Sequence, residues 1–250
     1  MNSRAILRTL DAHKQPVHVA KFSTLDPSQV LSCSDDNTVK LWDVPSQTAI
    51  TTFTSHTDYV RSGQFSTSSP RLLLTGSYDG TVRLFDGRSG EAEMVFGRQS
   101  TASSNTAPVE QVLMFPSGTV VLSSAGPILR VWDLVAGGKC MRAMSNHQKT
   151  VTSLAFNSNA SRLLTGSLDH MVKVYDVGTY KVVHTMRYPA PILSLAVSVS
   201  LTPRSPLDPP LTSLSRTILT LLLECRTERS PSGGGRRSHP RRRPGSSKYR

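Results

Sequence analysis

The chain has 250 residues, a formal net charge of +12 and three widely separated cysteines. It has no Cys-x-x-Cys pair, no phosphate-binding glycine-rich loop and no apolar run long enough to span a bilayer, which argues against zinc-binding, nucleotide-binding-loop and helical membrane proteins. Arg4, Arg8 and Asp11 interrupt any signal-peptide core, so we expect a soluble intracellular chain without a metal or cofactor.

The chain begins with a short strand signal and then a first patterned unit. Residues 1–10, which contain AILRTL, are predicted to hold the last strand of a preceding unit whose other strands are missing. The unit at 11–53 carries His13 near its start, Asp36 in its middle and the aromatic–Asp pair Trp42-Asp43 beyond it.

Residues 54–96 repeat this arrangement with the same spacing. His56, Asp79 and the pair Phe85-Asp86 stand where the first unit has its own His, Asp and aromatic–Asp pair. Runs of β-favouring residues alternate with Ser, Pro, Gly and Asp, which are typical turn residues. Four strands are therefore predicted in this unit, at 59–65, 71–77, 81–86 and 91–96.

Residues 97–144 keep the period but lose part of the pattern. The pair Trp132-Asp133 is present, whereas Gly126 stands six residues before the aromatic, where the other units have Asp. No His precedes this unit. Joint loss of His and Asp is expected if each is useful only with the other.

Residues 145–186 restore the pattern with His147, Asp169 and Tyr175-Asp176, and 187–197 are predicted to open a fifth unit with a strand at 191–197. Four short strands in about 43 residues are typical of a β-propeller blade. We therefore expect an all-β, incomplete propeller of about four blades with partial blades at both ends, arising from a fragment, a short isoform or an imperfect gene model. A closed four-bladed ring is the alternative.

The repeated residues resemble those of the WD-repeat (WD40) family, in which a His, a Ser or Thr, an Asp and the aromatic residue form a buried hydrogen-bonded set that locks each blade. Carried over by position, the resemblance implies three sets: His13, Ser32, Asp36 and Trp42; His56, Thr75, Asp79 and Phe85; His147, Thr165, Asp169 and Tyr175. Phenylalanine cannot donate a hydrogen bond, so the second set is expected to be weaker at that point.

The same His, Ser and Asp residues also allow a hydrolase hypothesis, with His13, Ser32 and Asp36 as a catalytic triad. A nucleophile is needed only once, however, and no Gly-x-Ser-x-Gly turn is present. Threefold repetition favours a structural role, so we expect no catalytic residues.

Residues 198–250 differ in composition from the rest of the chain. They contain eleven Lys or Arg against three Asp or Glu and are rich in Ser and Pro, which predicts a disordered, low-complexity basic tail. Arg237 and Arg241 to Arg243 would suit contact with nucleic-acid phosphates or a nuclear import signal, and a merely solvated terminus is the alternative.

Five stretches resemble a ribosome-biogenesis branch of the family more closely than the family at large: 35–63, 76–91, 109–118, 129–138 and 162–188. The resemblance implies a non-catalytic scaffold of the small-subunit processome, located in the nucleus and nucleolus, that supports transcription by RNA polymerase I and processing to 18S rRNA. Its implied partners are other processome proteins and pre-ribosomal RNA or a small nucleolar ribonucleoprotein, directly or through partners, with no membrane or small-molecule substrate.

Candidate partner-binding residues are those that follow the histidines at the blade entrances: Lys14, Tyr59, Arg61 and Lys149. A cation also precedes the aromatic residue in every unit, at Lys40, Arg83, Arg130 and Lys173, and repeat consensus explains this stripe better than an RNA track does. An alternative function is that of a substrate receptor of a cullin-type ubiquitin ligase, because Asp86-x-Arg88 resembles an adaptor-docking element of some propellers.

Overall fold

The computed structural model describes residues 9–97 and 107–197. Within these ranges the regular secondary structure consists of sixteen strands in four antiparallel sheets. Most of the strand predicted in 1–10, and the whole of 198–250, lie outside the described residues.

Each sheet is a meander in which strands that follow one another in sequence are paired. The first sheet contains β1 (Val17–Phe22), β2 (Gln29–Ser34), β3 (Val39–Asp43) and β4 (Thr48–Phe53), and the second contains β5 (Val60–Phe65), β6 (Leu72–Ser77), β7 (Val82–Asp86) and β8 (Ala92–Phe96). The third contains β9 (Val109–Met114), β10 (Val120–Ala125), β11 (Ile128–Asp133) and β12 (Lys139–Met144). The fourth contains β13 (Val151–Phe156), β14 (Arg162–Ser167), β15 (Met171–Asp176) and β16 (Val182–Arg187).

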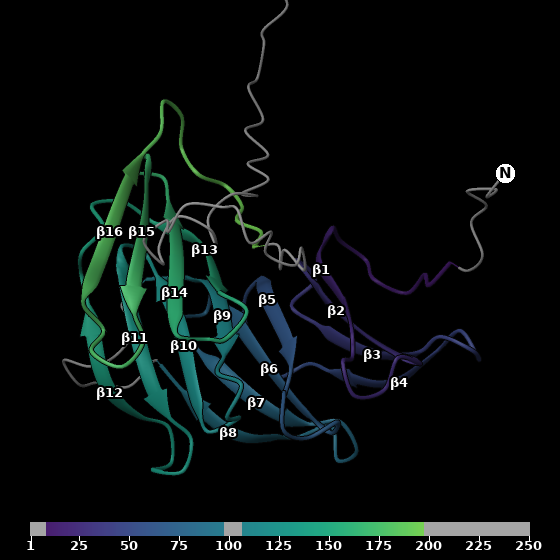
Figure 1. Cartoon of the computed structure of the whole chain (residues 1–250). Helices are drawn as coiled ribbons and strands as arrows, with labels where there is room; N and C mark the ends of the chain where they lie inside the picture. The colour runs from purple at the N-terminus through teal and green to yellow at the C-terminus, as the bar shows by residue number, and fades with distance from the viewer. Residues whose placement is uncertain (1–8, 98–106, 198–250) are drawn as a thin grey trace, which may run out of the picture.

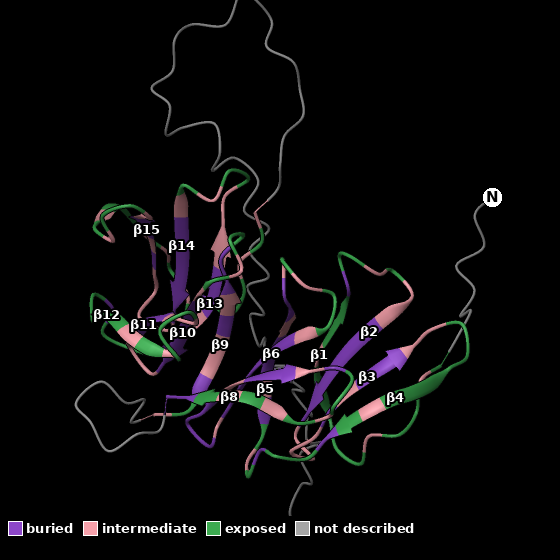
Figure 2. Ribbon diagram, turned by 90° about the horizontal axis from the view of Figure 1, so that it is seen from below, coloured by how far each residue is buried: buried purple, intermediate pink, exposed green. Residues whose placement is uncertain are grey.

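The four sheets stand side by side in an open arc, as the blades of an incomplete β-propeller (Figure 1). Consecutive first strands lie in contact, β1 with β5, β5 with β9, and β9 with β13. The fourth strand of each sheet is largely exposed, whereas the second strand is buried almost throughout (Figure 2). The all-β, incomplete-propeller fold predicted from the repeat is thus the fold observed.

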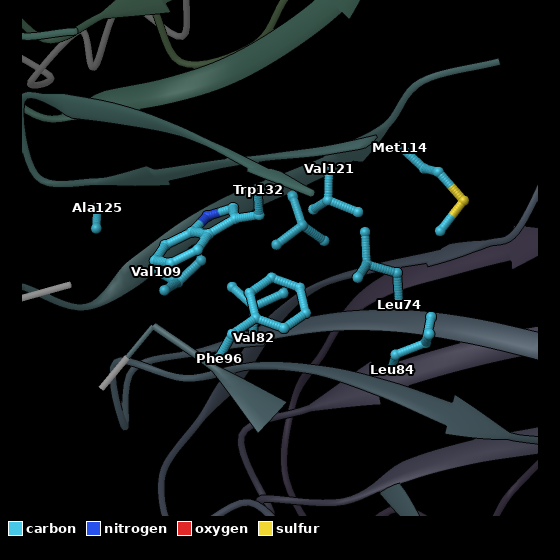
Figure 3. Packing of buried hydrophobic residues seen from close by; sticks show 10 residues of the cluster. Leu74, Val82, Leu84, Phe96, Val109, Met114, Val121, Ala125 and Trp132 are labelled. Atoms are coloured by element: carbon cyan, nitrogen blue, oxygen red, sulfur yellow. The ribbon is translucent and has the colours of Figure 1, made fainter. Parts of the chain in front are cut away.

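The hydrophobic core lies between sheets. Along β7, Val82 and Leu84 face the third sheet, while Phe85 belongs to the cluster shared with the first sheet, so both faces of the strand are buried. Figure 3 shows the layer between the second and third sheets, where the Phe96 ring lies 5.3 Å from the indole of Trp132. Burial of apolar side chains on both faces is what holds consecutive blades together.

The close approach of neighbouring blades depends on glycine in the second strand. A Cβ added at Gly76 would lie 2.7 Å from Val112 Cγ1 and 2.8 Å from Val109 Cγ1, both on β9. Gly166 has the same relation to Ile192 Cγ2, at 2.6 Å. Real Cβ atoms do not approach neighbours so closely, and only glycine fits without a shift.

Residues 191–197 do not form the strand that the sequence predicted. Ile192 is buried, its N–H donates to Ser167 O at 3.1 Å, and its carbonyl accepts from Thr152 Oγ1 at 2.6 Å. The segment therefore packs against β13 and β14 of the fourth sheet without forming a strand of its own. A strand needs a continuous ladder with a neighbour, and isolated bonds to β13 and β14 do not supply one.

Candidate functional site

The first of the predicted His–Asp sets is assembled in the first blade. His13 Nδ1 lies 2.9 Å from Asp36 Oδ2, and His13 Nε2 lies 2.7 Å from Ser32 Oγ. Trp42 Nε1–H donates to the same hydroxyl at 2.7 Å. The set joins the loop before β1, strand β2, the β2–β3 turn and strand β3, so it ties together the local elements of one sheet.

The second and fourth blades have the same geometry with a different aromatic residue. His56 lies 2.8 Å from both Asp79 Oδ2 and Thr75 Oγ1, and His147 lies 2.8 Å from Asp169 Oδ2 and 2.7 Å from Thr165 Oγ1. Phe85 has no donor and stacks instead, 4.7 Å from the ring of Phe53. The phenol of Tyr175 is buried beside Thr165, and burial raises its pKa to about 12.

The direction of the hydrogen bonds in each set follows from the aspartate. The carboxylate can only accept, so the histidine is protonated on Nδ1 and its Nε2 accepts from the Ser or Thr hydroxyl. Burial lowers the pKa of His56 and His147 despite their aspartate partners, which keeps the imidazole neutral near pH 7.

The aspartates are held ionised by several donors. Burial alone would raise the pKa of Asp79, but hydrogen bonds from His56 and Thr81 outweigh it and lower the pKa. Asp79 Oδ1 accepts from both the N–H and the hydroxyl of Thr81, at 2.8 and 2.6 Å. The pKa of Asp36 is lowered in the same way, with Thr38, the Lys14 N–H and His13 as donors.

The third blade retains only part of the set. Trp132 Nε1–H donates to Ser123 Oγ at 2.8 Å, as Trp42 does to Ser32. The spacing to Trp132 predicted Gly126 at the Asp position, but the structure does not place it there. The turn between β10 and β11 is shorter than in the other blades, and Gly126 has a φ of 57°, like Asn37, Gly80 and His170 in the other turns. The aspartate position itself is missing from this hairpin.

The burial of the hydroxyl groups bears directly on the hydrolase hypothesis. Ser32 is 6% exposed, and Thr75 and Thr165 are fully buried. Each hydroxyl contacts Nε2 of the histidine in its own sheet, and such burial leaves a substrate little access. Burial of all three hydroxyls favours a structural role for the sets over that of a nucleophile.

Arg61 lies in a surface cluster that joins three blades and is called the Arg61 cluster below. Its members are His18, Asp35, Tyr59, Arg61, Tyr78 and Glu110. Its guanidinium lies 5.0 Å from the ring centroid of Tyr78 and 5.7 Å from that of Tyr59, which is 44% exposed. Arg61 Nε is 3.1 Å from Asp35 Oδ1, in the first blade, and Asp35 Oδ2 is 2.8 Å from His18 Nε2.

The third blade joins this cluster through Glu110 on β9. Tyr78 O–H lies 3.0 Å from both Glu110 carboxylate oxygens, and burial together with this carboxylate raises the pKa of Tyr78 to about 12. Tyr59 and Arg61 were predicted as partner-binding residues from their positions after His56, whereas His18, Asp35, Tyr78 and Glu110 were not predicted. These residues come from separate segments and share no spacing, so no sequence signal linked them.

The other candidate binding residues are exposed. Lys14 and Lys149 lie on the loops that follow the buried histidines, and Arg88 lies in the β7–β8 turn, where its N–H donates to Asp86 Oδ1 at 2.8 Å. These three side chains lie outside the Arg61 cluster as the contacts define it.

Three of the four recurrent cations on the third strands either bond to a residue of their own blade or are buried. Lys40 Nζ donates to Thr52 Oγ1 at 3.1 Å, Arg83 Nε donates to Thr81 Oγ1 at 3.3 Å, and Arg130 is 4% exposed. Repeat consensus stays the prediction for this stripe.

Neither a metal site nor a membrane span is found in the described part of the chain. No group of three or more His, Cys, Asp or Glu residues in 9–97 and 107–197 could hold a metal ion. Those ranges also contain no helix that is long and apolar enough to cross a membrane.

Comparison with known families gives a match to the WD domain, G-beta repeat, at residues 4–43, 47–86 and 138–176. The matched ranges end at the first, second and fourth aromatic–Asp pairs. No matched range covers β9, β10 and β11 of the third blade, which lacks the His and the Asp, whereas β12 falls inside the third range.

Individual relatives are similar over most of the chain. The U3 small nucleolar RNA-associated protein 15 homolog of Xenopus tropicalis is 39% identical over 198 residues, 79% of this chain and 37% of the relative. The U3 small nucleolar RNA-associated protein 15 of Schizosaccharomyces pombe is 43% identical over 199 residues, which are 79% of this chain and 39% of the relative. Protein SLOW WALKER 1 of Arabidopsis thaliana is 39% identical over 201 residues, which are 79% of this chain and 37% of the relative. The chain thus spans under two-fifths of the length of these relatives.

Proposed function

The chain belongs to the WD40-repeat family, and from this premise we propose that it is a non-catalytic scaffold in ribosome biogenesis, as part of the small-subunit processome. The observation that carries the proposal is its similarity to proteins named for association with the U3 small nucleolar RNA, at 39% and 43% identity over 79% of the chain. Its partners in this role are other processome proteins and pre-ribosomal RNA or the U3 ribonucleoprotein.

The structure is suited to holding partners in fixed positions. Three buried His–Asp sets stiffen individual sheets, and apolar layers lock neighbouring sheets together. The Arg61 cluster, with the exposed Tyr59, crosses three blades on such a framework. Tyr and Arg are the residue types that most often dominate protein interfaces, so this cluster is the partner-binding surface we propose.

The more detailed role follows from the same proposal. We expect the protein in the nucleolus, where it supports transcription by RNA polymerase I and processing of the precursor towards 18S rRNA. A tagged chain should concentrate in nucleoli, and sequencing of its bound RNA should recover U3 RNA and pre-ribosomal RNA. A diffuse cytoplasmic signal without these RNAs would reject the proposal.

A matched pair of variants links the proposal to the Arg61 cluster. We expect Arg61→Gln to reduce recovery of processome proteins, whereas Arg71→Gln, an exposed arginine in the β5–β6 loop, should leave recovery unchanged. Equal recovery with both variants would place the partner surface elsewhere.

A second candidate function is that of a substrate receptor of a cullin-type ubiquitin ligase. The exposed Arg88 side chain, on a turn held by Asp86, favours it, since adaptor docking needs an accessible arginine there. Co-purification with a ligase adaptor that is lost on Arg88→Ala but kept on Arg71→Ala would support this function over the processome role.

A further inference from the structure

The outer edge of the third and fourth blades carries exposed cations. Lys139 and Arg142 lie on β12, Arg187 lies on β16, and Lys181 directly precedes β16. These four residues are called the basic rim below. Figure 2 shows how much of β12 is exposed.

The basic rim is part of a division of charge along the arc. Residues 9–97 contain seven Lys or Arg and ten Asp or Glu, whereas residues 107–197 contain eight and four. Glu93 lies on β8, the outer strand of the second blade, and Glu91 directly precedes β8. Both residues are exposed. By strand register, Glu91 of the second blade corresponds to Lys139 and Lys181 of the third and fourth, so this one position changes from acidic to basic.

The acidic residues near the basic rim are already engaged. Between 134 and 197 the sequence contains two, Asp169 and Asp176. Asp169 is paired with His147, and Asp176 forms an ion pair with Arg162 and accepts from the Thr179 N–H at 3.0 Å. Asp133, opposite Lys139 in the ladder, accepts the Val135 N–H at 2.8 Å.

Arg142 bridges the two blades and is fixed in place. Its Nη1 donates to the Thr179 carbonyl at 2.6 Å, and its guanidinium lies 5.6 Å from the ring centroid of Tyr180. The bond to Thr179 uses one of five N–H donors. A guanidinium that is already oriented can bind a phosphate with less loss of side-chain freedom than a mobile one.

We propose that the basic rim is a direct RNA-binding surface that holds the phosphate backbone of a single strand across the third and fourth blades. Four exposed cations in a part of the chain with few acidic residues favour a polyanion, and an extended edge of two adjacent blades suits a chain of phosphates. Contacts to phosphate groups carry no sequence information, so we expect this binding to be independent of base sequence. The inference rests on the proposed function and specifies which surface contacts RNA.

The test is the salt dependence of RNA binding by the full chain. The probe is a short, fluorescently labelled single-stranded RNA of mixed sequence, followed by anisotropy as monovalent salt is raised. Arg142→Gln should reduce the slope of log affinity against log salt by about 0.7, and Arg142→Gln with Lys181→Gln by about twice that. Near 0.1 M salt the affinity should fall roughly fivefold for each cation removed.

The matched control is Arg71→Gln, which removes one exposed arginine from the second blade. The basic residues in 198–250 are present in every variant, so their contribution cancels. Arg142→Lys keeps the charge and should retain most of the slope. The proposal is overturned if Arg142→Gln behaves like Arg71→Gln, or if Arg142→Lys loses as much affinity as Arg142→Gln.

The outcomes separate this inference from the proposed function. If U3 RNA is recovered with the tagged chain but the rim variants bind RNA normally in vitro, the processome role stands and the rim assignment fails. If the rim variants lose processome proteins while RNA affinity is unchanged, the surface binds protein, which also overturns the assignment. Loss of RNA affinity without recovery of U3 RNA from cells rejects the processome role alone.

Discussion

Asp79 is the residue on which the second His–Asp set depends. Its two oxygens accept from His56, from the N–H of Thr57 and from both donors of Thr81. Removal of the carboxylate leaves several buried donors without their partner, and each such donor costs about 1–3 kcal/mol.

We therefore expect Asp79→Ala to lower the free energy of unfolding by about 3 kcal/mol. Glu93→Ala removes an exposed carboxylate from the same blade and should change it by less than about 0.5 kcal/mol. Urea unfolding of both variants measures the difference. Equal stability would show that the set does not hold the blade.

The pH dependence of stability follows from the same groups. The pKa of His56 and His147 is lowered, mainly by burial, so the unfolded chain binds these protons more readily. Their contribution is complete above the unfolded-state value of about 6.5 and is lost as pH falls towards the folded pKa. The pKa of Asp36, Asp79 and Asp169 is also lowered, so their contribution is lost as pH falls below about 3.9.

We expect the melting temperature to decline from about pH 7 to about pH 5 and more steeply in stronger acid. His147→Gln should flatten the first part of this decline, which differential scanning calorimetry can follow. A melting temperature that rises as the solution is acidified would contradict the assigned protonation states.

At the residue scale, the sequence predicts many of the residues that meet but not all of their partners. The resemblance to WD repeats, carried over by position, implied three sets, and in each of them the His contacts both the Asp and the Ser or Thr. Thr38 and Thr81 also bind the aspartates, and their recurrence two residues after Asp36 and Asp79 was an available signal. The Arg61 cluster was beyond reach because its members meet only through packing of different blades.

At the scale of strands, glycine sets the distance between blades. A Cβ at Gly76 would overlap Val109 and Val112, and the layer between the second and third sheets is already filled. Gly76→Ala should therefore reduce the free energy of unfolding by about 1–3 kcal/mol through overpacking.

The control for Gly76→Ala is Gly178→Ala. Gly178 lies in the β15–β16 turn, where an added Cβ meets only Asp176 Oδ1 at an ordinary 3.5 Å. The control should have little effect in chemical denaturation. If Gly76→Ala left the free energy of unfolding unchanged, the second and third sheets could move apart without loss of stability.

The strands themselves were predicted closely where alternation and turn residues agree. In the second blade the four strands end at the predicted residues and begin within one of them. In the third blade the counted spacing misplaced Gly126, because a shorter hairpin keeps the period approximately while removing one position. At 191–197 the local β-propensity predicted a strand that the structure lacks, because a strand also needs a partner that the sequence does not specify.

At the scale of the whole molecule, the blades differ in how many neighbours they have. The second and third sheets are packed on both faces, whereas β1 is exposed along most of its length, with Phe22 64% exposed. Stacked repeats gain stability from each interface with a neighbour, so a sheet with one neighbour opens more readily.

Native-state hydrogen exchange should show this gradient. We expect the amide of Leu31 on β2 to exchange faster than that of Leu74, its counterpart on β6, although both residues are fully buried. Mass spectrometry of peptides from the two strands gives the comparison. Uniform protection across all four sheets would indicate a single cooperative unit.

The meander within each sheet has a consequence for how the protein is made. Every backbone ladder closes between segments adjacent in sequence, so a nascent chain can complete one sheet before the next has left the exit tunnel. The apolar layers form only when the following sheet arrives. We therefore expect each completed sheet to dock on the sheet made before it. Until the next sheet arrives, one apolar face of the newest sheet stays exposed to solvent.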